Sequence, residues 1–374
     1  MRISANFDGG NIDVINVQAP NNIELAICPD EGGEFFQWFN FKLDGTIGMQ
    51  YQLHIVNADK ASYPQGWENY QAVASYDREH WFRLPTRYHD GRLSIEVELE
   101  CDSIQIAYFA PYSYERHQDL LAQFQVHPMV SVEHLGLTLD ERDLSLVKIG
   151  DADESKASVW ITARQHPGET MAEWLVEGLI SQLLDGDNPV SRALLAKANF
   201  YIVPNMNPDG GVRGHLRTNA AGVNLNREWQ SPSLEKSPEV FHVVNKMQQT
   251  GVDLFYDVHG DEDLPYVFLA GCEGVPRFDD AMNTLQQTFE NALLLASPDF
   301  QTQFGYDEDA PGQANLTVAS NWVADRFGCL SYTLEMPFKD NDDLAEPIQA
   351  WSPERSILLG EASLVAMNAV LNKR

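Results

Sequence analysis

SVWITARQHPGETMAEWLVEGLISQLL, residues 158–184, contains a strand pattern, a tight turn and a helix pattern in direct succession. The apolar run 158–163 has the composition of a buried strand. In 169–184 apolar residues recur at the i, i+3, i+4 spacing of an amphipathic helix. Between them lies a turn built by His166, Pro167 and Gly168. A strand that leads through a short turn into a helix is the repeating unit of α/β folds.

Three further strand-like runs end in polar residues. NPDG (207–210) follows FYIVP, HGDE (259–262) follows DLFYDV, and Glu335 follows LSYTL. In open α/β sheets the chemistry gathers beyond the carboxyl ends of the strands, so we expect these stretches to meet QHPGE (165–169) there. Helical patterns cover 237–249, 278–296 and 353–371. Together they predict an α/β fold with a mixed, largely parallel sheet covered by helices on both faces.

The first third of the chain has a different pattern of apolar runs and turn residues. Up to about residue 116, short apolar or aromatic runs alternate with turn signals such as DGT and HDGR. This spacing predicts an antiparallel β-sandwich-like domain. A helix pattern at 113–125 then leads into the α/β region. We therefore predict two domains, residues 1–116 and 117–374, as expected for a chain of 374 residues.

The chain carries a formal net charge of −30, which argues against binding to nucleic acid or to an anionic membrane surface. No stretch approaches the roughly 20 apolar residues needed to span a bilayer, and the start of the chain lacks a signal-peptide pattern. These features predict a cytoplasmic protein. The four cysteines are widely spaced without a CxxC pair, so we expect neither a disulfide nor a cysteine metal site.

His166 and Glu169, three residues apart, are candidate metal ligands. The spacing alone is weak, because His259 and Glu262 repeat it, and a histidine at a strand end is more often an ordinary turn residue. However, His259 lies at a second strand end and completes a set of two histidines and one glutamate. Such a set, with the fourth position left to water, is a known catalytic zinc arrangement.

The irregular segment HLRTNAAGVNLNREW (215–229) carries Arg217, Asn226 and Arg227. Two guanidinium groups and a carboxamide are suited to holding a substrate carboxylate and polarising a carbonyl, because arginine offers a planar fork of permanent donors. The alternative for either arginine is a surface salt bridge.

Five motifs in this order carry a resemblance to a known family: HPGE (166–169), NPDG, GVNLNREW preceded by Arg217, DVHG (257–260) and YTLE (332–335). The chain resembles the zinc metallocarboxypeptidases related to carboxypeptidase A, and is most similar to their cytosolic carboxypeptidase branch. Residues 63–97 and 108–116 also resemble the amino-terminal β-domain of that branch. The resemblance thus covers most of the chain.

The resemblance implies an enzyme that removes the C-terminal residue of a peptide or protein. One Zn²⁺ per chain would be held by His166, Glu169 and His259, and Glu335 would act as general base and then general acid. Zinc lowers the pKa of its bound water to about 7, which suits a neighbouring carboxylate base. By the same resemblance Arg217 would stabilise the oxyanion, while Asn226 and Arg227 would grip the terminal carboxylate.

Three features depart from the family pattern, one of which is HGDE (259–262) in place of the HGH associated with the branch. Asn224 stands where the family often has an aspartate that orients a zinc-binding histidine. The family's mobile tyrosine is not placed either, because Tyr332 is too near Glu335 and the segment upstream holds Trp322.

The side chain of the substrate's last residue is expected to meet the segment 320–333, whose only basic residue is Arg326. If Arg326 points into the pocket, an acidic C-terminal residue is preferred. If it is solvated at a helix end, it carries no information on specificity.

Two other functions remain open from the sequence. One is a zinc acylase of the aspartoacylase or succinylglutamate desuccinylase kind, against which the first domain argues. The other is a non-catalytic zinc-containing binding protein, against which the retained Glu335 argues. The oligomeric state and the role of the first domain are open.

Overall fold

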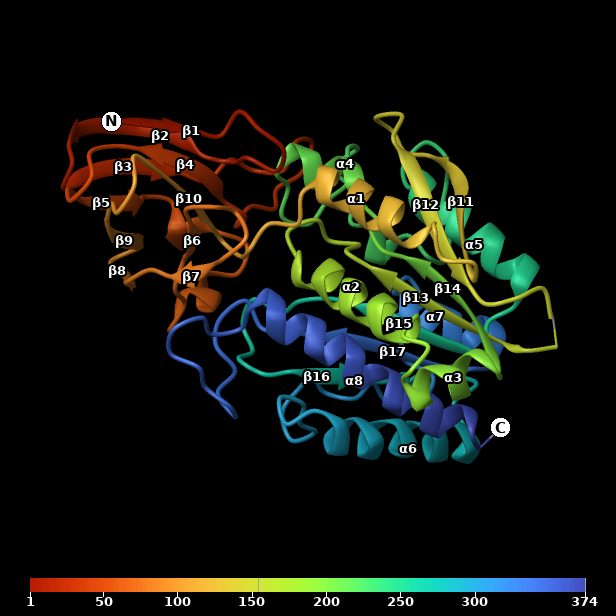
Figure 1. The fold of residues 1–374 in the computed structure, drawn as a ribbon. Coiled ribbons are helices and arrows are strands. Elements are labelled where there is room, and N and C mark those ends of the chain that lie inside the picture. Colours follow the sequence, from red (N-terminus) through yellow and green to blue (C-terminus); the bar gives the residue numbers. More distant parts are fainter. Residues whose placement is uncertain (154, 374) are drawn as a thin grey trace.

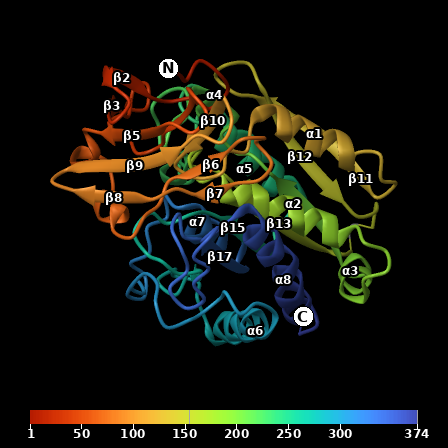
Figure 2. The same cartoon turned by 60° about the vertical axis from the view of Figure 1, so that its left-hand side comes forward.

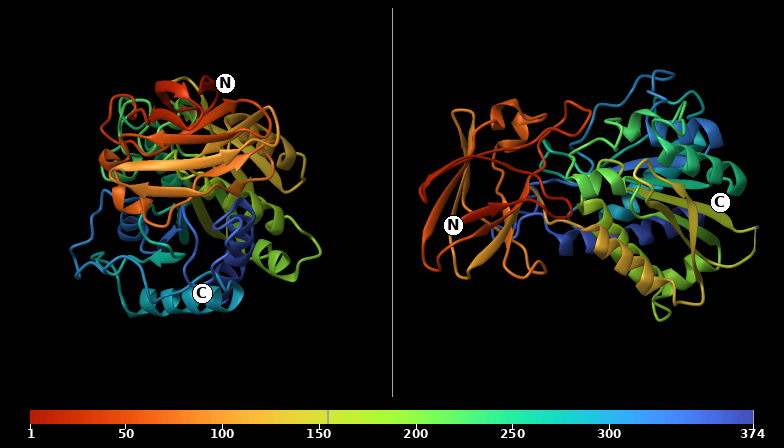
Figure 3. Two further views of the ribbon diagram at one scale, coloured as in Figure 1. Left: turned by 90° about the vertical axis from the view of Figure 1, so that its left-hand side faces the viewer. Right: turned by 90° about the horizontal axis from the view of Figure 1, so that it is seen from above.

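The computed structural model describes residues 1–153 and 155–373. A β-rich N-terminal lobe lies beside a larger α/β lobe that carries the C-terminus (Figure 1; Figure 3, right). The helix that follows the β-rich lobe, α1 (Tyr114–Phe124), begins where the side chain of Ser113 accepts a hydrogen bond from the backbone N–H of Arg116. The exact division at 116/117 stays a prediction.

The N-terminal lobe consists of two sheets, whose strands are labelled in Figure 1, and they share one apolar core. The first has the order β1 (Arg2–Ser4), β4 (Asn40–Asp44), β10 (Ser103–Ala107), β6 (Val73–Ser75) and β7 (Phe82–Arg83). The second has the order β2 (Asp13–Ala19), β3 (Asn22–Ala26), β5 (Gln50–Ile55), β9 (Arg92–Glu98) and β8 (Thr86–His89). Short 3-10 turns occupy Ala58–Lys60 and Pro64–Trp67.

Within the described residues, β3 and β5 are the only parallel pair of this lobe. The prediction of an antiparallel sandwich is therefore confirmed apart from this pair. The pair is parallel because the chain leaves β3, contributes β4 to the other sheet, and returns to β5 in the direction of β3. Such a crossover needs a long connection, and residues 27–49 supply it.

The α/β lobe is built on one mixed sheet. Its order is β11 (Val130–Leu137), β12 (Asp143–Ile149), β14 (Ala198–Val203), β13 (Ala157–Ala163), β15 (Leu254–Val258), β17 (Leu330–Glu335) and β16 (Phe268–Ala270). Strands β14, β13, β15 and β17 are parallel, while β11, β12 and β16 pair antiparallel at the two sides. The largely parallel sheet predicted from the sequence is confirmed.

Helices cover both faces of this sheet because its strands are apolar on both sides. On β13, Val159 and Ile161 face α2 (Met171–Leu183), α3 (Pro189–Leu195), α6 (Asp280–Ala296) and α8 (Pro353–Leu371). Trp160 faces the opposite side, where α5 (Pro238–Thr250) and α7 (Ala319–Phe327) pack. In the rotated view of Figure 2, helix α7 is seen apart from helices α8 and α6.

Helix α2 differs from the amphipathic helix expected at 169–184. It starts at Met171, and nearly all of its side chains are buried rather than one face. The reason is its position, since it lies between the sheet and α8 and also meets the N-terminal lobe, where Tyr112 packs edge-on against Trp174. The polar Glu173 is tolerated inside because Arg164 and His117 pair with it.

The two lobes are joined by buried polar and aromatic contacts. The guanidinium of Arg83 on β7 donates hydrogen bonds to the carbonyl oxygens of Phe338 and Trp351, at 3.0 and 2.8 Å. The ring of Tyr108 stacks on Phe338, with centroids 4.5 Å apart.

In the described part of the chain, no helix has both the length and the apolarity that a membrane crossing requires.

Candidate active site

Three predicted metal ligands meet at the carboxyl edge of the sheet. His166 follows β13, Glu169 lies two residues before the start of α2, and His259 directly follows β15. Glu169 Oε1 lies 2.6 Å from His166 Nδ1, and Glu169 Oε2 lies 2.8 Å from His259 Nδ1. The two Nδ1 atoms are 3.2 Å apart, and all three side chains are at most 3% exposed. Among the described residues this is the one cluster of three or more such ligands.

The turn that carries His166 is held by a buried arginine. Arg164, at φ 59°, turns the chain away from β13, and its guanidinium donates to the carbonyl oxygens of Pro167 and Tyr112. Gly168 is required at the next step, because a Cβ there would come within 2.8 Å of the carbonyl oxygen of Leu216. This packing aims His166 and Glu169 at one point, as the sequence predicted.

The outer nitrogens of both imidazoles contact oxygen acceptors. His259 Nε2 lies 2.9 Å from a carboxylate oxygen of Asp257, and His166 Nε2 lies 3.0 Å from Asn224 Oδ1. An N–H at each Nε2 leaves the Nδ1 lone pair free to face the common point. Asn224 thus makes the orienting contact that an aspartate would make, through a neutral oxygen. This donor set, buried and converging, fits a zinc ion.

The charges in this cluster favour metal binding. Burial, with help from Arg217, lowers the pKa of His166 to about 4, so its imidazole is neutral. Burial raises the pKa of Glu169, but the two histidines lower it by a larger amount, so that the pKa ends below its usual range. Burial also opposes the charge of His259, but Asp257 and Glu169 raise its pKa well above the ordinary value. A metal ion must displace that proton, so its binding releases a proton from the site.

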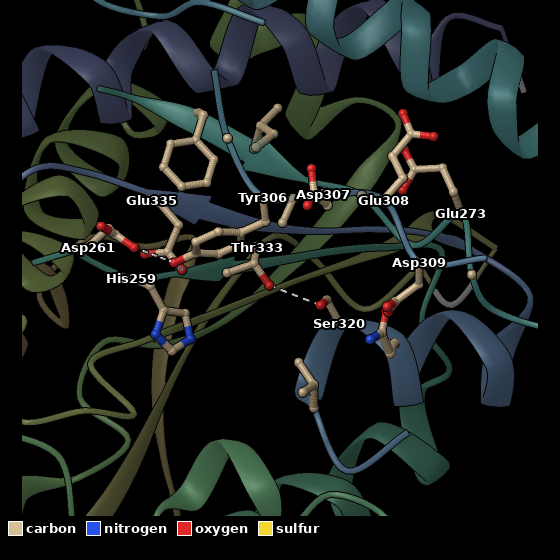
Figure 4. Close-up of a pocket in the computed structure, with 18 of the residues that line it drawn as sticks. His259, Asp261, Glu273, Tyr306, Asp307, Glu308, Asp309, Ser320, Thr333 and Glu335 are labelled. Carbon is tan, nitrogen blue, oxygen red and sulfur yellow. Dashed lines mark hydrogen bonds between the residues drawn. The ribbon is translucent and has the colours of Figure 1, made fainter. Parts of the chain in front are cut away.

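Glu335 is the last residue of β17 and faces the same cavity (Figure 4). It is 6% exposed, and its Oε2 has no hydrogen-bond partner among the described residues. Burial raises the pKa of Glu335 well above its usual range; His259 opposes the rise, and Glu169 adds to it. A buried carboxylate with a free oxygen and a raised pKa has the properties of a general base and acid.

Tyr306 is a site residue that the sequence did not reveal. Its hydroxyl donates to Asp261 Oδ2 at 2.5 Å and lies 3.3 Å from Glu335 Oε1 (Figure 4). Its ring packs edge-on against Phe268 on β16. The available signal was a lone tyrosine in the polar, glycine-containing segment 301–312. Tyr332 and Trp322, considered from the sequence, pack instead in the cores on the two faces of the sheet.

Arg217 is placed by residues of the N-terminal lobe. The carboxylate of Asp30, 2% exposed, accepts hydrogen bonds from the backbone N–H groups of Leu216, Arg217 and Thr218 at 2.6–2.9 Å. It also accepts from the hydroxyl of Thr218 at 2.9 Å.

The rings of Phe35 and Tyr63 each lie 5.6 Å from the Arg217 guanidinium carbon. No sequence pattern pointed to Asp30, Phe35 or Tyr63. Their positions show that the first lobe helps to build the cavity.

Asn226 and Arg227 line the cavity as predicted, on the short 3-10 turn Leu225–Arg227. Asn226 Oδ1 accepts from the backbone N–H of Ala319 at the start of α7. Its Nδ2 lies 3.5 Å from His259 Nε2. Arg227 donates to the carbonyl oxygen of Asn226 at 2.7 Å, and burial lowers its pKa. Neither arginine of this segment is a surface salt-bridge residue within the described structure.

Two features considered from the sequence lie outside the cavity lining. Arg326 is exposed at the end of α7, beside the ring of Phe327, and is absent from the described residues that line the cavity. NPDG also lies outside this lining, since it begins the short helix α4 (Pro208–Arg213). There Asp209 accepts hydrogen bonds from Thr138 and Arg142. A polar stretch after a strand can serve the fold as well as the site.

The cavity itself has a volume of about 1140 Å³ and extends from the metal cluster past Glu335 and Thr333 towards α6 (Figure 4). One end is lined by the three candidate metal ligands together with Arg217, Asn226 and Arg227. The other end is lined by polar and acidic side chains of the segments around 273, 290 and 308.

Comparisons with known proteins identify the family of this chain. Residues 118–357 match the family model described as zinc carboxypeptidase, and residues 3–109 match the cytosolic carboxypeptidase N-terminal domain. Mouse cytosolic carboxypeptidase 6 is 30% identical over 90% of this chain and 67% of its own length.

Two solved structures are similar over the whole chain. One is from Shewanella denitrificans, provisionally described as a carboxypeptidase A, with 72% identity, a TM-score of 0.99 and 100% and 99% coverage of the two chains. The other is a metallo-carboxypeptidase from Pseudomonas aeruginosa in complex with (2-guanidinoethylmercapto)succinic acid, with 46% identity, a TM-score of 0.97 and full coverage of both chains. The chain belongs to the zinc carboxypeptidase family and carries the N-terminal domain of its cytosolic branch.

Proposed function

We propose that this protein removes the C-terminal residue from peptides or proteins, using one zinc ion per chain held by His166, Glu169 and His259. The observation that supports this most directly is the convergence of these three buried side chains next to Glu335. The family description supports zinc as the metal. A cytoplasmic location is part of the proposal and is supported by the name of the matching N-terminal domain.

Glu335 is the proton carrier in this proposal. Bound zinc would polarise the scissile carbonyl and lower the pKa of a water molecule. Glu335, which lines the cavity, takes a proton from the attacking water and later gives a proton to the leaving amine. The Tyr306 hydroxyl, 3.3 Å from Glu335 Oε1, helps to orient this carboxylate.

The guanidinium groups hold the charges of the substrate. Arg217 donates to the oxygen that becomes negative during the reaction, where a preorganised donor lowers the barrier. Asn226 and Arg227 hold the terminal carboxylate. The Pseudomonas relative was solved with a compound that contains succinic acid carboxylates, and this supports a carboxylate subsite here. The acidic preference depended on Arg326, which lies outside the cavity lining, so it is not included.

A free terminal carboxylate should be required for cleavage. We expect the zinc-loaded protein to shorten a peptide by one residue, and to leave the same peptide with an amidated C-terminus intact. Arg227→Gln should raise KM for the free peptide about 10-fold to 100-fold, because a charge-assisted bond to a carboxylate is lost. Mass spectrometry of timed digests measures both.

Arg326 is exposed and lies outside the cavity lining. The variant Arg326→Gln is therefore the matched control and should change neither KM nor kcat. Equal cleavage of the free and amidated peptides would contradict the exopeptidase proposal. Hydrolysis of N-acyl amino acids without any peptide hydrolysis would favour the acylase alternative.

Asp30 should act on catalysis through Arg217. In Asp30 one carboxylate oxygen accepts from the backbone N–H of Leu216 and the other from those of Arg217 and Thr218, so the N–H₂ group of Asp30→Asn leaves at least one backbone donor without its acceptor. We expect kcat to fall about 10-fold to 100-fold with little change in KM, because the shifted segment misplaces the oxyanion donor. Steady-state kinetics on one peptide provide the measurement.

A double-mutant cycle separates this positioning role from a general loss of stability. In an Arg217→Met background, Asp30→Asn should have little further effect on kcat, since both changes remove the same contribution. Asp102→Asn, on the surface of the same lobe, should behave as the wild type. Independent, additive losses would show that Asp30 does not work through Arg217.

A further inference from the structure

The cavity continues past the catalytic groups into an acidic pocket. Thr333 and Ser320, whose hydroxyls are 2.9 Å apart, line the passage (Figure 4). Beyond them lie the carboxylates of Glu273, Asp307 and Glu308 (Figure 4). Glu290 of α6 also lines this end. The neutral hydroxyls give the passage no charge, so the far end determines which side chain is attracted.

This pocket has no cationic partner of its own. Among the described residues that line the whole cavity, ten carry carboxylates and only two, Arg217 and Arg227, carry a guanidinium. Both arginines lie beside the three candidate metal ligands. In the proposed function they bind the oxyanion and the terminal carboxylate of the substrate, not its last side chain. The carboxylates at the far end are therefore left without a balancing charge.

Gln286 provides an independent sign of a missing donor. This residue of α6 lines the cavity and is only 7% exposed. Its side-chain N–H₂ donates to Glu273, which fixes the orientation of the amide. Its Oε1 then has no donor among the described residues. A buried carbonyl without a donor is unfavourable. Because this oxygen has almost no exposed surface, a ligand N–H group would satisfy it only after the Gln286 side chain turns towards the cavity.

The raised pKa of Glu290 also favours a positively charged group in this pocket. Burial and then the charge of Glu273 raise the pKa of Glu290 to about 7, while Gln286 opposes the rise and Glu308 adds to it. A positive group between these carboxylates would relieve their repulsion.

A metal ion is not the group that this pocket fits. In the described part of the chain, Glu273, Glu290 and Glu308 do not form a cluster with ligand atoms close enough to share one ion. Acceptors that are spread apart suit a guanidinium, with its fork of N–H donors, or an ammonium on a flexible stem.

We propose that the pocket binds the side chain of a basic C-terminal residue, arginine or lysine, and rejects an acidic one. The inference rests on the proposed carboxypeptidase function, because the passage starts beside Glu335. The cation pairs with the carboxylates of Glu273 and Glu290, whereas a glutamate side chain would be repelled by the same carboxylates.

The test uses the zinc-loaded full chain and four peptides that differ only in the last residue: Arg, Lys, Glu and Phe. We expect kcat/KM for the Arg or Lys peptide to exceed that for the Glu peptide about 100-fold. A preference for the Glu peptide would overturn the inference.

Charge-neutral variants locate the effect. The double variant Glu273→Gln/Glu290→Gln should lower kcat/KM for the Arg and Lys peptides about 10-fold to 100-fold and leave the Phe peptide within about twofold. Asp280→Asn, an exposed residue on the same helix α6 and outside the cavity lining, is the matched control. Equal losses on all four peptides would overturn the inference.

A binding measurement keeps the pocket testable if no peptide is cleaved. That outcome would count against the proposed function, and calorimetry with free arginine, lysine and glutamate would then test the pocket alone. Tighter binding of arginine or lysine, lost in the double variant, supports the inference. Equal or tighter binding of glutamate overturns it.

Discussion

Removing metal with a chelator is expected to abolish peptide hydrolysis, and one equivalent of zinc per chain is expected to restore it. His166, Glu169 and His259 present their ligand atoms to one point, and the outer nitrogens of both imidazoles already contact oxygen acceptors, so little rearrangement of the two rings is needed. A ligand present at about 1,000 times its Kd stabilises the folded state by ~4 kcal/mol. Zinc should therefore also raise the Tm.

His259→Ala should remove both responses, because two protein ligands hold zinc weakly. His242→Gln, a half-buried histidine on α5 and away from the cluster, is the matched control and should still take up one zinc. Metal analysis and thermal unfolding measure the two effects. Full activity in the chelated protein would contradict the zinc assignment, and uptake of two tightly bound zinc ions would contradict the count.

Replacing Glu335 by glutamine is expected to lower kcat about 10³-fold, because general acid and base catalysis contributes on this order. The amide has nearly the same shape as the carboxylate, so the cavity and the fold should be kept. It cannot accept a proton from water at neutral pH. Binding of the substrate should change little, and the loss should be in kcat rather than in KM.

Glu335→Gln should retain its zinc, which distinguishes it from the ligand variants. Glu361→Gln, on α8 and outside the catalytic cavity, serves as the control for an unrelated glutamate and should keep full activity. Single-turnover kinetics with the variant report the chemical step directly. A kcat within tenfold of the wild type would show that another group moves the proton.

Much of this architecture could be predicted from the sequence. The buried strands are continuous apolar runs, and parallel strands place their carboxyl ends at one edge, so residues as distant as His166 and His259 were expected to meet. The same reasoning was incomplete for NPDG. That stretch also follows a parallel strand, but its side chains support a helix and a hydrogen-bond network. Strand order alone does not determine which way a side chain points.

Other parts of the site could not be predicted, because they depend on how distant segments pack. Tyr306 reaches Glu335 from an irregular segment whose path follows no periodicity. Asp30 binds the backbone of the segment that carries Arg217, across the contact between the two lobes. The face of α7 that Arg326 occupies depends on how that helix packs on β15 and β17.

The amino-acid sequence by itself determined the α/β sheet, the separate β-rich lobe and the three candidate metal ligands, because periodicity and strand ends are local properties. Only the tertiary structure decided which charges line the cavity. It excluded Arg326 from the cavity lining, brought in Tyr306, Asp30 and Glu290, and assigned the N-terminal lobe a role in building the site. The physical reason is that a charge acts over distances in space, and contacts between residues far apart in the chain exist only once both lobes have packed.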